Sequence, residues 1–126
     1  MQSRKFILVV EDDPNLRRLY RLTLVFDGFE VQEAVDGIDA LRAIDERPPD
    51  LVVLDLDLPR LSGHSVYQEI AAHAVTRHIP VVIVTATDLD PATIDVACVL
   101  HKPVMLDELL VTVRRCLAAG APAAGS

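Results

Sequence analysis

The stretch from Lys5 to Pro14 reads KFILVVEDDP, an apolar run that ends in three consecutive acidic residues. A short run rich in valine and isoleucine is typical of a strand that is buried on both faces, as in a parallel sheet. Asp13 and Pro14 then have the pattern of a helix start, with aspartate as the N-cap and proline at the first helical position. The stretch therefore predicts a strand followed at once by a helix, with Glu11 and Asp12 at the junction.

The same pattern occurs three more times, and each apolar run ends at a polar side chain suited to binding phosphate or metal. The runs are Leu51–Leu54 before Asp55, Val81–Val84 before Thr85, and Val96–Leu100 before His101 and Lys102. Helical patterns separate these runs, so the order predicts an α/β fold with a parallel sheet, whose ligand crevice lies beyond the carboxyl ends of the strands. One site is therefore expected at that edge. Its residues are Glu11, Asp12, Asp55, Thr85 and Lys102.

Periodicity and turn residues give the remaining elements, a strand and a helix repeated five times. The first three strands are expected at Lys5–Val10, Glu30–Ala34 and Asp50–Leu54, with a fourth after Pro80 and a fifth at Val96–Leu100. The second strand alternates polar and apolar residues, which is typical of an edge strand. Leu106, Leu109, Val113 and Leu117 recur at helical spacing and predict an amphipathic final helix.

Length, charge and hydropathy restrict the class of protein. A chain of 126 residues predicts one domain, placed at residues 1–118, with the Ala/Gly/Pro-rich residues 119–126 as a flexible tail or the start of a linker. The net charge of −7 argues against direct binding to nucleic acid or to an anionic membrane. No segment resembles a signal peptide or a membrane span, which predicts a cytoplasmic location.

Cys98 and Cys116 lie in apolar surroundings and are predicted to be buried structural thiols, since nothing suggests a disulfide framework.

The predicted site contains only oxygen ligands for a metal. Three crowded carboxylates, Glu11, Asp12 and Asp55, repel one another unless a cation or a proton intervenes. Hard oxygen ligands favour Mg²⁺ or Mn²⁺ over zinc or copper. A carboxylate beside such a metal can act as a nucleophile towards a phosphoryl group, whose charge the metal, Lys102 and a hydroxyl would neutralise.

At this point the residues match a known family. The matching motifs are ILVVEDDP at 7–14, PDLVVLDLDLP at 49–59, Ser62-Gly63, PVVIVTA at 80–86 and His101-Lys102-Pro103. In this order the motifs resemble the receiver domain of two-component response regulators from Lys5 to Leu117. The resemblance implies a flavodoxin-like, doubly wound sheet of five parallel strands in the order 2-1-3-4-5. That order agrees with an edge position for the second strand.

The resemblance also implies a role for each site residue. Asp55 resembles the phosphoacceptor, Thr85 the switch hydroxyl, and Lys102 the lysine that pairs with the phosphoryl group. Glu11 and Asp12 resemble the acidic metal pair. The backbone carbonyl of Asp57 would be a further metal ligand, small Ala86 would leave the phosphoryl group accessible, and the Lys102–Pro103 bond would be cis. The implied cofactor is Mg²⁺ or Mn²⁺, and the implied partner is a sensor histidine kinase or a phosphotransfer protein, with an unknown downstream effector.

Two features depart from the family pattern. Lys102 follows Thr85 by only 17 positions, which is shorter than in usual receivers by more than one turn of α-helix. Helix four is therefore expected to be short, irregular or absent, and residues 87–97 are expected to be the mobile part that responds to phosphorylation. Val99 occupies the position where the family usually has Tyr or Phe, whose ring reports on the switch threonine.

Three hypotheses about function follow. The leading one is a phosphoacceptor receiver domain, a signalling protein rather than a conventional enzyme, which catalyses its own phosphorylation and dephosphorylation. The alternative is a protein-interaction module on a receiver fold that signals without phosphorylation, which Val99 and the short Thr85–Lys102 spacing favour. The third is a phosphatase of the haloacid dehalogenase type, since Asp55-Leu56-Asp57 matches its D-x-D motif. In that family, however, the motif follows the first strand, whereas here it follows the third.

Overall fold

The computed structural model describes residues 4–87 and 98–119 of the chain. Within this part the helices are α1 (Pro14–Phe26), α2 (Gly37–Glu46), α3 (Gly63–Ala72) and α4 (Leu106–Ala119). The strands are β1 (Phe6–Val10), β2 (Glu30–Ala34), β3 (Leu51–Asp55), β4 (Val81–Thr85) and β5 (Val99–His101). In the same part of the chain, no helix is long and apolar enough to cross a membrane.

The five strands form one parallel sheet in the order β2-β1-β3-β4-β5, which confirms the predicted fold and the edge position of β2. β1, β3 and β4 are buried along their whole length, as their continuous apolar sequences require. Several strand boundaries differ from the prediction, and β1 and β3 each begin one residue later than expected. Asp55, expected just beyond the third strand, is its last residue because it still pairs with Val84 of β4. Strand β5 ends at His101, one residue later than expected, and has three residues.

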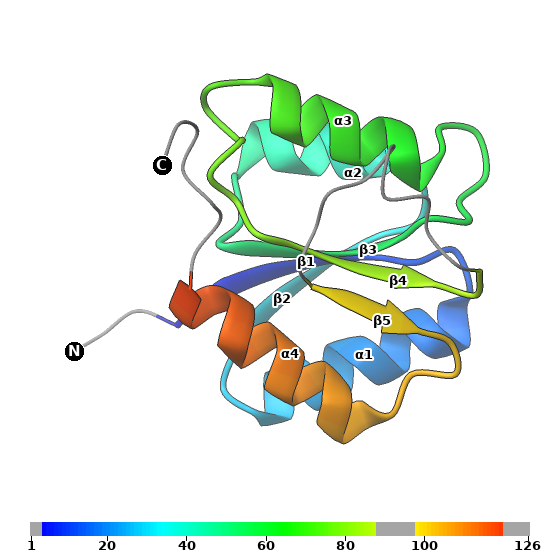
Figure 1. Cartoon of the computed structure of the whole chain (residues 1–126), viewed down its shortest axis with the longest axis vertical. Coiled ribbons are helices and arrows are strands. Elements are labelled where there is room, and N and C mark those ends of the chain that lie inside the picture. The colour runs from blue at the N-terminus through cyan, green and yellow to red at the C-terminus, as the bar shows by residue number, and fades with distance from the viewer. Residues whose placement is uncertain (1–3, 88–97, 120–126) are drawn as a thin grey trace.

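Two pairs of helices cover the two faces of the sheet. Figure 1 shows α2 and α3 above the sheet and α1 and α4 below it. Alternate residues of each central strand point to opposite faces, so Val52 and Leu54 of β3 join one apolar cluster while Leu51 and Val53 join the other. Helices therefore cover both faces of the sheet, and the carboxyl ends of the strands are left uncovered by these helices.

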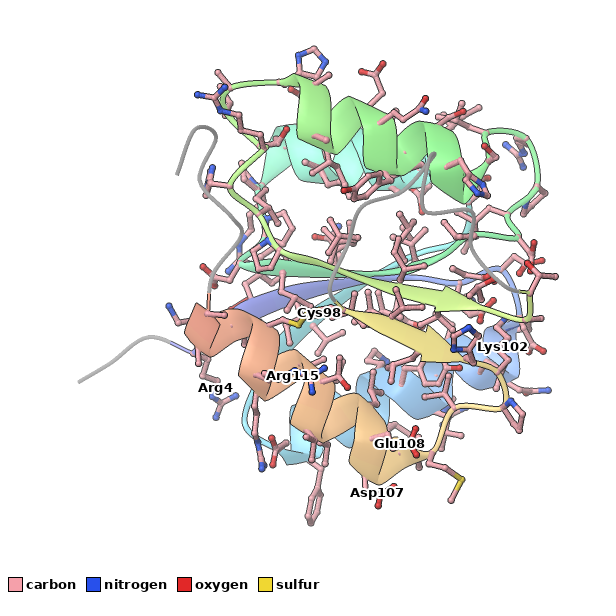
Figure 2. All side chains as sticks on the ribbon, viewed as in Figure 1. Arg4, Cys98, Lys102, Asp107, Glu108 and Arg115 are labelled. Carbon is pink, nitrogen blue, oxygen red and sulfur yellow. A yellow bond between two sulfur atoms is a disulfide. The ribbon has the colours of Figure 1, made fainter. Side chains whose placement is uncertain are left out.

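The helix labelled α4 is the one that the sequence predicted as the fifth helix. Its first turn contains Asp107 and Glu108 (Figure 2), which suits the positive end of the helix dipole. The prediction of a short or irregular helix four falls on residues 88–97, outside the described residues. The prediction that residues 87–97 are mobile falls almost entirely on the same part of the chain.

The prediction of two buried thiols is wrong, because the structure joins Cys98 and Cys116 in a disulfide. Cys116 lies on the buried face of α4, and Cys98 comes directly before β5, where Figure 2 shows it beside that helix. Their Cα atoms are 6.8 Å apart, although the two residues are 18 positions apart in the chain. The sequence correctly indicated the apolar surroundings of both residues. Their pairing depends on how α4 packs against β5, which neither local pattern encodes.

Candidate functional site

Four strands place the predicted site residues at one edge of the sheet. Glu11 directly follows β1, Asp55 ends β3, Thr85 ends β4, and Lys102 follows β5. Asp55 is 2% exposed and Glu11 only 1%, so both carboxyl groups are almost fully removed from solvent. Buried carboxyl groups are costly unless they are paired, protonated or bound to a cation. The site therefore needs a proton on one carboxyl group or positive charge from the chain or a ligand.

Lys102 supplies the positive charge from the chain. Its Nζ lies 3.2 Å from Oδ2 of Asp55 and 3.3 Å from Oε1 of Glu11. The backbone N–H of Lys102 donates to the carbonyl of Thr85 at 2.8 Å, which extends the ladder between β4 and β5 by one residue. The Lys102–Pro103 bond is cis, as predicted. Figure 2 shows Lys102 just beyond β5, on the side towards which the arrowheads of β4 and β5 point.

The three predicted metal-binding carboxylates are close together. One oxygen each from Glu11, Asp12 and Asp55 lies within 4.8 Å of the others, a grouping that could hold a metal ion. Oε1 of Glu11 is buried and accepts no hydrogen bond from the part of the chain that is described, although it ion-pairs with Lys102. A buried oxygen that has an ammonium group nearby but accepts no hydrogen bond from the described residues, beside two further carboxylates, fits an oxygen-binding divalent cation such as Mg²⁺. Asp12 itself is exposed, so the cluster opens towards solvent on one side.

The environment shifts two pKa values in this cluster. Burial, a hydrogen bond with Asp55 and the charge of Asp55 raise the pKa of Glu11 to about 8. Burial lowers the pKa of Lys102, but the charges of Asp55 and Glu11 together outweigh this effect and raise it. Lys102 therefore stays charged at neutral pH. Without a metal, Glu11 is largely protonated there, which relieves its repulsion with Asp55.

The raised pKa of Glu11 predicts how stability changes with pH in metal-free buffer. The folded chain holds the Glu11 proton more tightly than the unfolded chain between pH 4.5 and about 8. This contribution is full below pH 4.5 and is lost as the pH rises through 8. We expect the stability of the wild type, relative to Glu11→Gln, to fall by about 2 kcal/mol or more between pH 5 and 9. Urea unfolding at each pH measures this, and parallel curves for the two chains would contradict it.

The loop after β3 approaches Asp55 through its backbone. The N–H of Asp57 donates to Oδ1 of Asp55 at 3.0 Å, while Asp57 itself is exposed. The role of its backbone carbonyl as a metal ligand stays a prediction. The N–H of Gly63 donates to the carbonyl of Leu56 at 3.2 Å and draws the start of α3 onto the end of β3. A Cβ atom on Gly63 would lie 2.5 Å from the Cα of Leu56 and would also overlap the carbonyl oxygen of Asp55. Only glycine allows this close approach.

The residues predicted to take part in switching are Thr85, Ala86 and Val99, and they differ in burial and in their contacts. Thr85 is fully buried, and the hydrogen bonds of its hydroxyl within the described residues go to Thr87, including donation to the Thr87 carbonyl at 3.0 Å. Ala86 is exposed at the edge of the sheet, and its role in leaving the phosphoryl group accessible stays a prediction. Val99 is half-buried and packs against the cluster of apolar residues on the α2–α3 face.

Sequence reasoning missed Arg17. Nη1 of this α1 residue donates to the carbonyl of Glu11 at 3.0 Å and to that of Asp12 at 3.4 Å. Helical spacing places Arg17, and not Arg18, three and seven positions before the buried Tyr20 and Leu24, but it does not show what Arg17 binds. Their difference arises from the position of the helix over the end of β1.

A doubly wound parallel sheet in the order 2-1-3-4-5, with its polar groups at the carboxyl edge, is the arrangement of flavodoxin-like domains. The chain matches the response regulator receiver domain over residues 7–114 and belongs to this family of two-component signalling domains.

Curated relatives agree with this family. The chain is 37% identical over 127 aligned positions to "Response regulator MprA" of Mycobacterium sp. (strain KMS), covering 94% of this chain and 53% of that protein. It is 35% identical over 119 positions to "DNA-binding dual master transcriptional regulator RpaA" of Synechocystis sp., covering 88% of this chain and 48% of that protein. The chain therefore spans about half the length of these relatives.

Solved structures agree with the fold. The receiver domain of the sensor histidine kinase PA1611 from Pseudomonas aeruginosa PAO1, with a magnesium ion in its active-site cleft, superposes with a TM-score of 0.84 at 29% identity, covering 92% of this chain and 99% of that one. A putative response regulator from Chloroflexus aurantiacus also gives a TM-score of 0.84, at 28% identity, covering 92% and 99% of the two chains.

Proposed function

We propose that this chain is a phosphoacceptor receiver domain that takes a phosphoryl group onto Asp55 and thereby alters its contact with a partner. The observation that supports this most directly is the buried Asp55 carboxylate, 3.2 Å from the Lys102 ammonium and grouped with Glu11 and Asp12. The proposed donor is a phosphohistidine of a sensor histidine kinase or of a phosphotransfer protein. The proposed cofactor is Mg²⁺, with Mn²⁺ as the other ion that such a ligand set suits.

The proposed chemistry needs one nucleophile and several positive groups. A carboxylate oxygen of Asp55 attacks phosphorus, the P–N bond to the donor histidine breaks, and the imidazole leaves with the bonding electrons. Lys102 neutralises charge on the transferred group from its position beside Asp55. Glu11, Asp12, Asp55 and the backbone carbonyl of Asp57 would hold Mg²⁺, which supplies further charge neutralisation on the phosphoryl oxygens. Because Glu11 must lose its proton to bind a cation, Mg²⁺ should bind more weakly at low pH.

Thr85 and Ala86 are proposed to act after transfer. The Thr85 hydroxyl now donates to the Thr87 carbonyl, so it must leave that partner to donate to the phosphoryl group. Such an exchange would transmit the state of Asp55 to the segment after β4. Ala86 is exposed and small, and we propose that it leaves room for water to reach the acyl phosphate, which would support self-catalysed dephosphorylation.

The proposed domain arrangement is a receiver domain at residues 1–118 and a tail or linker start at 119–126, although helix α4 extends to Ala119. The relative RpaA is named a DNA-binding regulator, and this chain spans about half its length. With a net charge of −7, the receiver domain itself is proposed to bind its kinase and an effector surface rather than nucleic acid.

Direct phosphorylation of the purified chain tests this proposal. Incubation with acetyl phosphate and Mg²⁺ is expected to add one phosphoryl group, detected by intact-mass spectrometry and located on the peptide containing Asp55. The modification should be lost on treatment with hydroxylamine, because an acyl phosphate is a mixed anhydride that this nucleophile cleaves, and it should not form in excess EDTA. Labelling at another residue, or hydrolysis of the phosphate donor without any adduct on Asp55, would contradict the proposal, and the second result would favour the phosphatase alternative.

A phosphorylation-independent interaction module is the second candidate, and Val99 is the observation that favours it. The half-buried valine packs into the apolar cluster and has no ring that could rotate between buried and exposed positions. A partner that binds the phosphorylated wild type and an unphosphorylated chain with the same affinity would support this candidate. A partner whose affinity changes on phosphorylation would reject it.

A further inference from the structure

The arrangement around Arg17 links α1, β2 and the backbone of the acidic pair. Arg17 is only 17% exposed, and its Nε lies 3.1 Å from Oε1 of Glu33 on β2. Its Nη1 donates to the carbonyls of Glu11 and Asp12 at 3.0 and 3.4 Å. The guanidinium group therefore makes three contacts at once, two of them to the main chain of residues proposed to bind the cation.

We propose that Arg17 is a positioning residue, which sets the affinity of the site for a divalent cation by fixing the backbone of Glu11 and Asp12. This inference rests on the proposed function, because it concerns the cation site of that function. Arg17 touches neither Asp55 nor Lys102, according to the contacts of the described residues. Its effect must therefore pass through the main chain of the acidic pair.

The backbone needs such support at this point because the sheet ends there. The N–H of Glu11 makes a hydrogen bond to Ala34 of β2 at 3.2 Å, and the chain then leaves the sheet to enter α1. The carbonyls of Glu11 and Asp12 lie at this junction, and the two hydrogen bonds from Arg17 hold them. Mg²⁺ demands near-ideal ligand geometry, so a looser backbone at these residues should weaken its binding.

A simple charge effect predicts the opposite sign. Arg17 brings a positive charge close to the proposed cation site, and Glu33 offsets it only in part, because Glu33 also ion-pairs with Arg21 at 3.1 Å. Removing Arg17 should therefore tighten Mg²⁺ binding if its charge were all that mattered. Loss of positioning should weaken Mg²⁺ binding when Arg17 is removed, whereas loss of charge should tighten it. The dissociation constant for Mg²⁺ therefore distinguishes the two effects.

The test compares Arg17→Met with Arg18→Met, which makes the same charge change at an exposed position one residue along the helix. Calorimetric titration with MgCl₂ alone gives the dissociation constant of each chain, with no phosphoryl donor present. We expect Arg17→Met to raise this constant about tenfold and Arg18→Met to leave it unchanged or slightly lower. Arg17→Lys keeps the charge but lacks the planar guanidinium group with its several N–H donors. It should therefore recover only a small part of the lost affinity for Mg²⁺.

A second measurement distinguishes positioning from general damage. Labelling of Asp55 by acetyl phosphate should need more Mg²⁺ in Arg17→Met but should reach a rate within about twofold of the wild type at saturating Mg²⁺. If Arg17→Met is poorly folded, Glu33→Gln keeps the arginine and removes its carboxylate anchor, and it should raise the dissociation constant by a smaller factor. An unchanged or tighter constant in Arg17→Met, or an equal loss in Arg18→Met, would overturn the inference. A wild type that binds Mg²⁺ but takes no phosphoryl group would overturn only the proposed function.

Discussion

An Asp55→Asn chain is expected to take up no phosphoryl group from acetyl phosphate, while Asp57→Asn is labelled at nearly the wild-type rate. The amide of asparagine is a very poor nucleophile, so the rate should fall by roughly two orders of magnitude or more. Asp57 serves as the matched control because it lies two residues away, has the same side chain and is exposed. Its N–H, which donates to Asp55 at 3.0 Å, remains in the variant.

Loss of labelling in Asp55→Asn should not result from unfolding. Asp55 is buried beside Glu11 and helps to raise its pKa, so replacing the Asp55 carboxylate with an amide lets Glu11 ionise more readily and pair with Lys102. Lys102 retains Glu11 as a partner at 3.3 Å. We therefore expect the melting temperature of Asp55→Asn to equal or exceed that of the wild type in metal-free buffer. A variant that folds normally and still becomes labelled would exclude Asp55 as the phosphoacceptor.

A Gly63→Ala chain is expected to be less stable than the wild type by about 3 kcal/mol. In an ordinary helical position the same change stabilises a protein by about 1 kcal/mol, because alanine is the better helix former. Here the added Cβ would lie 2.5 Å from the Cα of Leu56 and would overlap the carbonyl oxygen of Asp55. Both atoms belong to the backbone at the end of β3, so the clash cannot be relieved by rotating a side chain.

Urea unfolding measures this effect, with His64→Ala as the control at the next, exposed position of α3. The control should change the free energy of unfolding by no more than about 0.5 kcal/mol. Gly63→Ala should also slow the labelling of Asp55, since relieving the clash moves the backbone of the phosphoacceptor. Equal stability of Gly63→Ala and wild type would show that α3 can shift away from β3 at little cost.

The sequence alone determined the layers of the fold and the edge at which the site lies. Continuous apolar runs predicted buried parallel strands, and the alternation in residues 30–34 predicted the edge strand that the structure confirms. Such predictions succeed because they depend only on side-chain type and a period of two or of 3.6 residues. The same reasoning placed Glu11, Asp55, Thr85 and Lys102 at strand ends, where the structure has them.

Only the tertiary structure decided how these groups are partnered. The sequence indicated three acids near a lysine, but the raised pKa of Glu11 depends on its burial and on its distance from Asp55. The sequence predicted Cys98 and Cys116 to be separate buried thiols, but the packing of α4 on β5 joins them in a disulfide. Arg17 and Arg18 are neighbouring residues of the same type, yet only Arg17 reaches the carbonyls of the acidic pair. These properties arise from distances between elements far apart in the chain, which no local pattern specifies.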